Sequence, residues 1–128
     1  WVNDSKATNI GACIAALEGY DKKVILIAGG DGKGADMNEL ASVIHLKAKA
    51  VILIGKDALS IEAALNQLPD IIPAYHAESM DEVVAIAAHI AQAHDTVLLS
   101  PACASLDQYK NYQDRGLQFI QAIARLDV

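Results

Sequence analysis

The sequence is poor in basic residues, with ten Lys and Arg against sixteen Asp and Glu and a formal charge of −6. An acidic surface repels phosphate backbones, so this balance argues against a nucleic-acid-binding protein and, by the same reasoning, against binding to anionic membranes. No apolar run approaches the roughly 20 residues that span a bilayer. The basic and apolar regions of a secretory signal are also missing. We therefore expect a soluble, cytoplasmic protein that binds neither nucleic acid nor membrane.

Cysteine is also scarce. Cys13 and Cys103 lie far apart and share no CxxC or Cys/His spacing, which is typical of packing residues in a reduced cytosolic chain. The four histidines are scattered and do not form the i, i+4 pair of a helical zinc site. No Ser/His/Asp or Cys/His set has an interpretable spacing. We expect neither a metal site built by this chain alone nor an independent hydrolase.

The chain has 128 residues and 53% hydrophobic content, a size that is common for one domain with a substantial core. It opens on Trp1 without an initiator Met, and its first two residues read like the end of a strand. No internal repeat, low-complexity tract or linker divides it. We expect residues 1–128 to be a single domain that is a fragment of a longer protein.

Apolar runs of strand length alternate with segments of helical periodicity, the pattern of βαβ units with a mostly parallel sheet. The predicted strands are residues 1–2, 24–28, 50–54, 71–74 and 96–99. Their nearly continuous apolar character is typical of strands that are covered by helices on both faces. The fold class that we predict is therefore α/β.

Five segments between and after these strands carry apolar residues at helical spacing. The positions are Ile10, Cys13, Ile14 and Leu17; Met37, Leu40, Ala41 and Ile44; Ile61, Ala64, Leu65 and Leu68; Val83, Ile86, Ala87 and Ile90; and, in a last helix over residues 114–126, Leu117, Ile120 and Ala124. The fourth segment follows Ser79 and Glu82, a capping-box pair in which each side chain satisfies the other residue's backbone donor.

The loops that follow the predicted strands are chemically unusual, whereas the loops that enter them are ordinary charged turns. The unusual loops cover residues 3–8, 29–36 and 100–105. In a parallel α/β sheet, ligands bind beyond the carboxyl ends of the strands. This asymmetry predicts a site formed by the three loops.

The glycine loop, residues 29–36, matches the G-x-G-x-x-G/A dinucleotide fingerprint between a strand and a helix. The match is weak because the loop follows the second strand and because Gly55 and Lys56, not an acid, follow the next one. The Walker A pattern fails, since Ile27 and Gly34 occupy its first Gly and its terminal Ser/Thr positions. What remains is a loop that presents the Lys33 ammonium at a helix N-terminus, which favours a carboxylate or phosphate. The alternative is a tight turn with a solvated lysine.

The first and third loops offer further polar contacts. Asp4 and Lys6 provide an acceptor and a cation within one turn, while Thr8 or Asn9 is suited to cap the next helix. In residues 100–105, small side chains allow a ligand to approach the backbone, and Ser105 can donate to a carboxylate. Both loops also fit a simpler interpretation as strand-to-helix turns.

At these loops the chain resembles the Mur ligase family, and specifically its D-glutamate-adding members. The resemblance is carried by NDSKATN at residues 3–9, GGDGK at 29–33, LLSPACASLD at 98–107, YKNY at 109–112 and RG at 115–116. It covers essentially the whole chain, and its motifs occur in the family's order. It implies the C-terminal, Rossmann-like, amino-acid-binding domain of a monomeric three-domain enzyme, whose own N-terminal and central domains bind the UDP-sugar substrate and ATP.

The resemblance also implies a reaction. ATP phosphorylates the carboxylate of UDP-N-acetylmuramoyl-L-alanine, and the amine of D-glutamate attacks the acyl phosphate. Mg²⁺ and most phosphate ligands would belong to the central domain, so the isolated domain would be inactive.

Residue roles follow from the same resemblance. Thr8, Lys33, Ser105 and the backbone around Leu106 and Tyr112 would hold the two carboxylates of D-glutamate. Asp4 and Lys6 would face the nucleotide and the reaction centre, with Lys6 as the catalytic residue. The family usually has Phe where Tyr112 stands, a departure that a backbone contact would tolerate.

Two alternatives stay open at this point. One is a stand-alone nucleotide-binding or anion-binding regulatory module that uses the glycine loop. The other is the corresponding domain of a Mur ligase that adds a different amino acid.

Overall fold

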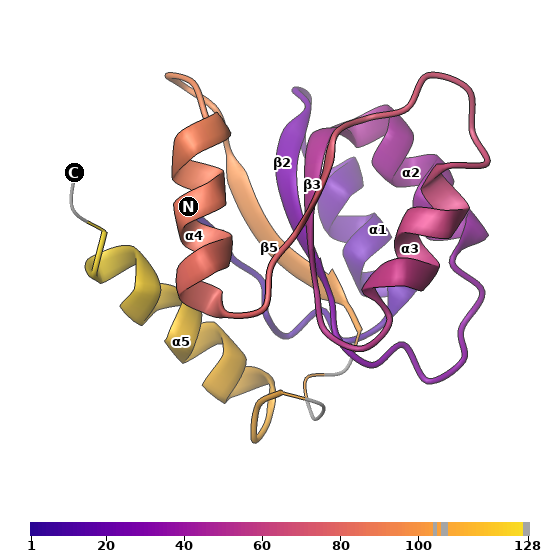
Figure 1. The fold of residues 1–128 in the computed structure, drawn as a ribbon. Coiled ribbons are helices and arrows are strands. Elements are labelled where there is room, and N and C mark those ends of the chain that lie inside the picture. The colour runs from indigo at the N-terminus through magenta and orange to yellow at the C-terminus, as the bar shows by residue number, and fades with distance from the viewer. Residues whose placement is uncertain (104, 106–107, 127–128) are drawn as a thin grey trace.

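A computed structural model describes residues 1–103, 105 and 108–126. In these residues, five parallel strands form one sheet in the order β1-β5-β2-β3-β4 (Figure 1). The elements along the chain are β1 (Val2–Asn3), α1 (Ile10–Glu18), β2 (Val24–Gly29), α2 (Asn38–Lys47), β3 (Ala48–Ile54), α3 (Ala58–Leu65), β4 (Ala74–His76), α4 (Met80–Ile90), β5 (Val97–Ala102) and α5 (Tyr112–Ala124). The predicted α/β class with a parallel sheet is confirmed.

Helices cover both faces of the sheet, with α1, α2 and α3 on one side and α4 and α5 on the other (Figure 1). Successive side chains of a strand point to opposite faces, so alternate residues of β2 join different cores. Leu26 packs with α1 and α2, whereas Ile25 and Ile27 pack with α4 and α5. Both faces are apolar, which explains the continuous hydrophobic runs in the sequence.

The chain reverses direction across the sheet at β5. It runs outward from β2 to β4 and then returns to insert β5 between β1 and β2. The loops after β1 and β2 lead to helices on one face, and the loop after β5 leads to α5 on the other face. Such a switch point leaves a crevice at the carboxyl ends of the strands, which is where parallel sheets bind ligands.

The fourth strand was predicted in the wrong place. Residues 71–74 were expected to form it, but β4 covers Ala74–His76, and Ile71 is 73% exposed. Pro73 explains the shift because it has no N–H to donate and restricts the preceding residue. Its carbonyl still accepts from the N–H of Val51 at 3.0 Å, so the ladder to β3 begins there.

The last helix turns a different face to the core from the predicted one. Leu117 and Ile120 are each 52% exposed, and Ala124 is also exposed. The buried residues are instead Arg115, Phe119 and Ala122. The rings of Phe119 and Trp1 are packed edge-on, with their centroids 6.0 Å apart. The rule of apolar spacing missed this face because one of its members is an arginine.

One of the two hydrogen bonds of the predicted capping box at the start of α4 is confirmed. The N–H of Glu82 donates to Ser79 Oγ at 3.2 Å, which satisfies one free donor of the helix. None of the helices in the described part of the chain has the length and apolar character needed to span a membrane.

Candidate functional site

The three unusual loops meet at the switch point, after β1, β2 and β5. Two backbone hydrogen bonds join the first loop to β5: Asp4 N–H donates to Leu99 O at 2.7 Å, and Ala102 N–H donates to Ala7 O at 2.9 Å. β5 itself extends through Ala102, further than the predicted 96–99, so part of the expected third loop is strand. The paired strands therefore fix the relative position of the first and third loops.

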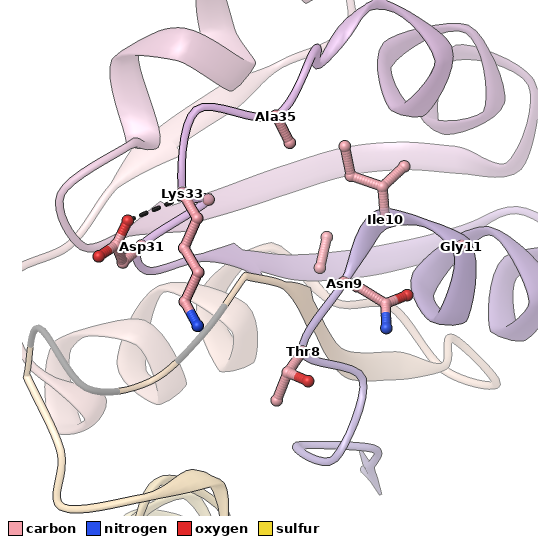
Figure 2. Close-up of a pocket in the computed structure, with 9 residues that line it drawn as sticks. Thr8, Asn9, Ile10, Gly11, Asp31, Lys33 and Ala35 are labelled. Atoms are coloured by element: carbon pink, nitrogen blue, oxygen red, sulfur yellow. Dashed lines mark hydrogen bonds between the residues drawn. The ribbon is translucent and has the colours of Figure 1, made fainter.

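A cavity of about 570 Å³ opens between the first loop and the glycine loop (Figure 2). Its lining consists of Thr8, Asn9, Ile10, Gly11, Asp31, Gly32, Lys33, Ala35 and Ala102. The Lys33 side chain reaches into it from the glycine loop, while Thr8 and Asn9 form the facing wall (Figure 2). The structure thus brings together two of the predicted substrate-binding residues, Thr8 and Lys33, which are far apart in the sequence.

The helix N-terminus at this cavity belongs to α1. Asn9 caps the helix, since its Oδ1 accepts from Ala12 N–H at 2.8 Å, so the Thr8 side chain is not used as the cap. Ile10 and Gly11, the first two residues of α1, line the cavity. Backbone N–H groups at a helix start and the dipole favour an anion there, and the Lys33 ammonium adds a full positive charge. The cavity therefore suits a carboxylate or a phosphate oxygen.

The prediction that the glycine loop leads Lys33 directly onto a helix N-terminus is wrong. α2 begins only at Asn38, after Met37 as its N-cap, and Lys33 lies in an irregular segment with a positive φ of 53°. The anion preference at Lys33 comes from its ammonium and from α1, not from the helix that follows it in the chain.

A carboxylate that sequence reasoning missed fastens the glycine loop. Asp57, just beyond β3, accepts from Gly32 N–H at 2.7 Å, and its own N–H donates to Gly30 O at 2.9 Å. Lys33 N–H donates to Asp31 Oδ1 at 2.9 Å. The N–H groups of Gly32 and Lys33 are therefore already used within the protein. This loop does not offer them to a pyrophosphate, which argues against the dinucleotide interpretation.

Gly29 is required where the glycine loop leaves β2. Its φ is +130°, and a Cβ added there would lie 1.8 Å from the carbonyl oxygen of Ile54. Only glycine allows the two backbones to approach so closely. The sequence showed this glycine, but its contact with β3 follows from the fold.

Two other predicted site residues, Lys6 and Tyr112, line a second cavity of about 350 Å³ between the first loop and α5. The Lys6 side chain is exposed. Asp4 is half-buried and accepts from Ser100 Oγ at 3.0 Å. Asp4 and Lys6 therefore lie in one turn, as expected, but Lys6 faces a different hollow from Lys33.

Ser105 is buried, with 3% of its surface exposed, and its carbonyl accepts from the N–H of Tyr109 at 2.9 Å. Leu106, the neighbouring predicted contact, lies outside the described residues. Cys13 and Cys103 are buried, as expected of packing residues, and are not joined by a disulfide. Burial raises the pKa of the Cys13 thiol to about 12, so this group stays neutral beside the site.

Comparison with known proteins shows the family of the chain. The model of the family described as "Mur ligase, glutamate ligase domain" matches residues 1–103. The chain belongs to the Mur ligase family. Of its relatives in the family, UDP-N-acetylmuramoylalanine--D-glutamate ligase from Methylococcus capsulatus is 52% identical over 126 residues, which cover 98% of this chain and 27% of that protein. The ligases of the same name from Nitrosococcus oceani and Pseudomonas putida are 50% and 47% identical, each over 98% of this chain and 28% of the relative.

This Mur ligase domain thus spans little more than a quarter of the length of the curated relatives that it matches. Its fold is similar to that of a murein peptide ligase from Psychrobacter arcticus, with a TM-score of 0.63 at 15% identity over 94% of this chain and 27% of that one. At that identity the likeness supports the fold alone.

Proposed function

We propose that this chain is the amino-acid-binding domain of a longer, cytoplasmic, ATP-dependent ligase that adds D-glutamate to UDP-N-acetylmuramoyl-L-alanine in peptidoglycan precursor synthesis. Relatives that carry this name are 47–52% identical over nearly the whole chain. The observation that carries the proposal is the cavity at the switch point, where Lys33 and the start of α1 favour a carboxylate.

D-glutamate would enter with its two carboxylates toward the domain and its amine toward the acceptor. The Lys33 ammonium and the Thr8 hydroxyl would donate to carboxylate oxygens, with Ser105 and the backbone around Leu106 and Tyr112 as the remaining contacts. Held at both ends, the amino acid would present its amine in one orientation. Such orientation of two reactants is a large part of what a ligase contributes to the rate.

The described residues do not fit a Mg²⁺ site of their own, because no group of three or more His, Cys, Asp or Glu gathers among them. We assign Mg²⁺ and most of the ATP contacts to the remainder of the longer protein. ATP would supply the phosphoryl group that activates the carboxylate of UDP-N-acetylmuramoyl-L-alanine. Lys6, whose side chain is exposed, is the residue we expect to stabilise negative charge at the reaction centre, with Asp4 beside it.

A substrate-panel assay of the longer protein tests the proposal. Phosphate release from ATP is measured with UDP-N-acetylmuramoyl-L-alanine and each of D-glutamate, L-glutamate, D-aspartate, L-lysine and meso-diaminopimelate. We expect release only when both D-glutamate and the UDP-substrate are present. Preference for another amino acid would support a different Mur ligase specificity. Tight binding of a nicotinamide cofactor without ligation would support the regulatory-module alternative.

A further inference from the structure

Arg115, in the first turn of α5, is a charged side chain with no exposed surface. Its guanidinium donates from Nε to Ser5 Oγ at 3.0 Å, from Nη2 to Ser5 O at 2.7 Å and from Nη1 to Cys103 O at 2.9 Å. Burial of an arginine is costly unless its donors are satisfied, so each of these bonds counts. One side chain therefore ties the loop after β1 to the end of β5.

Ser5 extends this contact to the start of α5. Its hydroxyl donates to Tyr112 O at 2.7 Å while it accepts from Arg115, and its N–H donates to Asn3 Oδ1 at 3.1 Å. Gly116 closes the arrangement, because a Cβ there would lie 3.0–3.2 Å from atoms of Asn3 and Ser5. We call Arg115, Ser5 and Gly116 the arginine clamp.

The clamp lies next to the predicted ligand contacts but is not itself among them. In the sequence, Ser5 lies directly before Lys6 and close to Thr8, and Cys103 lies close to Ser105. The Ser5 hydroxyl donates directly to Tyr112 O. A shift of the clamp would move these groups relative to one another. Lys33 lies on the glycine loop, which Asp57 holds instead.

We propose that Arg115 is a positioning residue for D-glutamate. It sets the spacing between Lys6 and Thr8 on one side of the site and Ser105 and Tyr112 on the other. The proposal rests on the proposed function. The planar guanidinium is essential to this role. A lysine ammonium is a single donor centre on a flexible stem and does not bond the carbonyls of Ser5 and Cys103 in a fixed geometry. The clamp thus acts on substrate binding through geometry and without contact to the substrate.

The test compares Arg115→Lys, Arg115→Met and Ser5→Ala in the longer ligase, with Arg125→Lys as the matched control. Arg125 is the C-cap of the same helix, but it is exposed and pairs with Asp81 at 2.8 Å. We expect the KM for D-glutamate to rise about tenfold or more in both Arg115 variants, since a displacement of about 1 Å at a binding group can cost a hundredfold. Ser5→Ala keeps the bonds of Arg115 to backbone carbonyls and should give a smaller rise. The KM for ATP should stay within about twofold, and Arg125→Lys should change neither constant.

Kinetics are measured well below the melting temperature of each variant, which separates geometry from stability. A lower melting temperature with an unchanged D-glutamate KM would overturn the proposal, because Arg115 would then be merely structural. If the Arg115 variants do not fold, an unchanged D-glutamate KM in Ser5→Ala would overturn it equally. Lys33→Ala separates the two claims: a raised D-glutamate KM there with none in the clamp variants refutes the clamp alone, whereas a parent protein that does not use D-glutamate refutes the proposed function.

Discussion

Replacement of Lys33 by alanine is the perturbation that the cavity geometry predicts most sharply. Lys33 reaches into the cavity beside Thr8 and the start of α1. A hydrogen bond to a charged group contributes about 1.5–3 kcal/mol. At about 1.4 kcal/mol per decade, that range corresponds to a ten- to more than hundredfold loss in binding. We expect Lys33→Ala to raise the KM for D-glutamate by this factor and to change the KM for ATP far less.

The substitution should leave the fold intact. The Lys33 side chain is exposed, and its backbone has a φ of 53°, a conformation in which alanine and lysine pay the same steric cost for their Cβ. A thermal melt checks this expectation. Lys22→Ala is the matched control, because Lys22 is an exposed lysine in the turn that enters β2, at the opposite end of that strand from the cavity.

Steady-state kinetics, with each substrate varied in turn, distinguish three outcomes. A selective D-glutamate defect supports the carboxylate assignment. A defect in ATP at least as large as that in D-glutamate would indicate a nucleotide cradle and refute the reasoning. No change in either constant would show that Lys33 is only a solvated turn residue.

Three further predictions concern stability. Gly29→Ala should destabilise the domain by more than about 3 kcal/mol in a urea melt, because its Cβ would lie 1.8 Å from Ile54 O at a positive φ. Gly34 has a φ of +76° with open space around it, so Gly34→Ala should cost only about 1 kcal/mol. Ser79→Ala should cost about 1 kcal/mol through loss of the α4 cap, with an unchanged denaturant m-value. Burial raises the pKa of Cys13 from 9.0 to about 12, so the folded state retains a proton that the unfolded chain loses. The stability that this group contributes is therefore complete below pH 9 and declines as pH rises toward 12. Denaturation at pH 8 and pH 10.5 should show this decline, and an equal decline in Cys13→Ala would contradict it.

The parallel sheet was predictable because its strands are apolar on both faces. Residues 24–28 and 50–54 lie within β2 and β3, and the helices predicted between strands are present. The position of β4 was not predictable from apolar character alone. Ile71 and Ile72 read as strand, but Pro73 places the ladder after them.

The last helix shows why burial is harder to predict than helicity. Leu117 and Ile120 have the expected spacing, yet Phe119 and Arg115 occupy the inner face. An arginine is normally read as a surface residue. The burial of Arg115 depends on the carbonyl oxygens of Cys103 and Ser5, and Ser5 lies 110 residues away in the sequence. Sequence spacing alone cannot supply such long-range partners.

The place of the candidate site was predictable, but its details were not. The rule that ligands bind beyond strand ends located the three loops, and the fold brings Thr8 and Lys33 to one cavity. The role of Asp57 was not predictable because this acid stands beyond Gly55 and Lys56, and its hydrogen bond with Gly32 depends on the fold. The division of Lys6 and Lys33 between two cavities follows from the path of the first loop, which no local pattern encodes.

The most direct test of the central claim is a crystal structure of the proposed longer ligase with D-glutamate bound. We predict that a carboxylate of D-glutamate lies about 3 Å from Lys33 Nζ, the distance of a charge-assisted hydrogen bond, and that Thr8 lies on the same side of the ligand. The amine should point away from α1, toward the rest of the protein. D-glutamate bound without contact to Lys33 and Thr8, or a nucleotide phosphate in their cavity, would contradict the account.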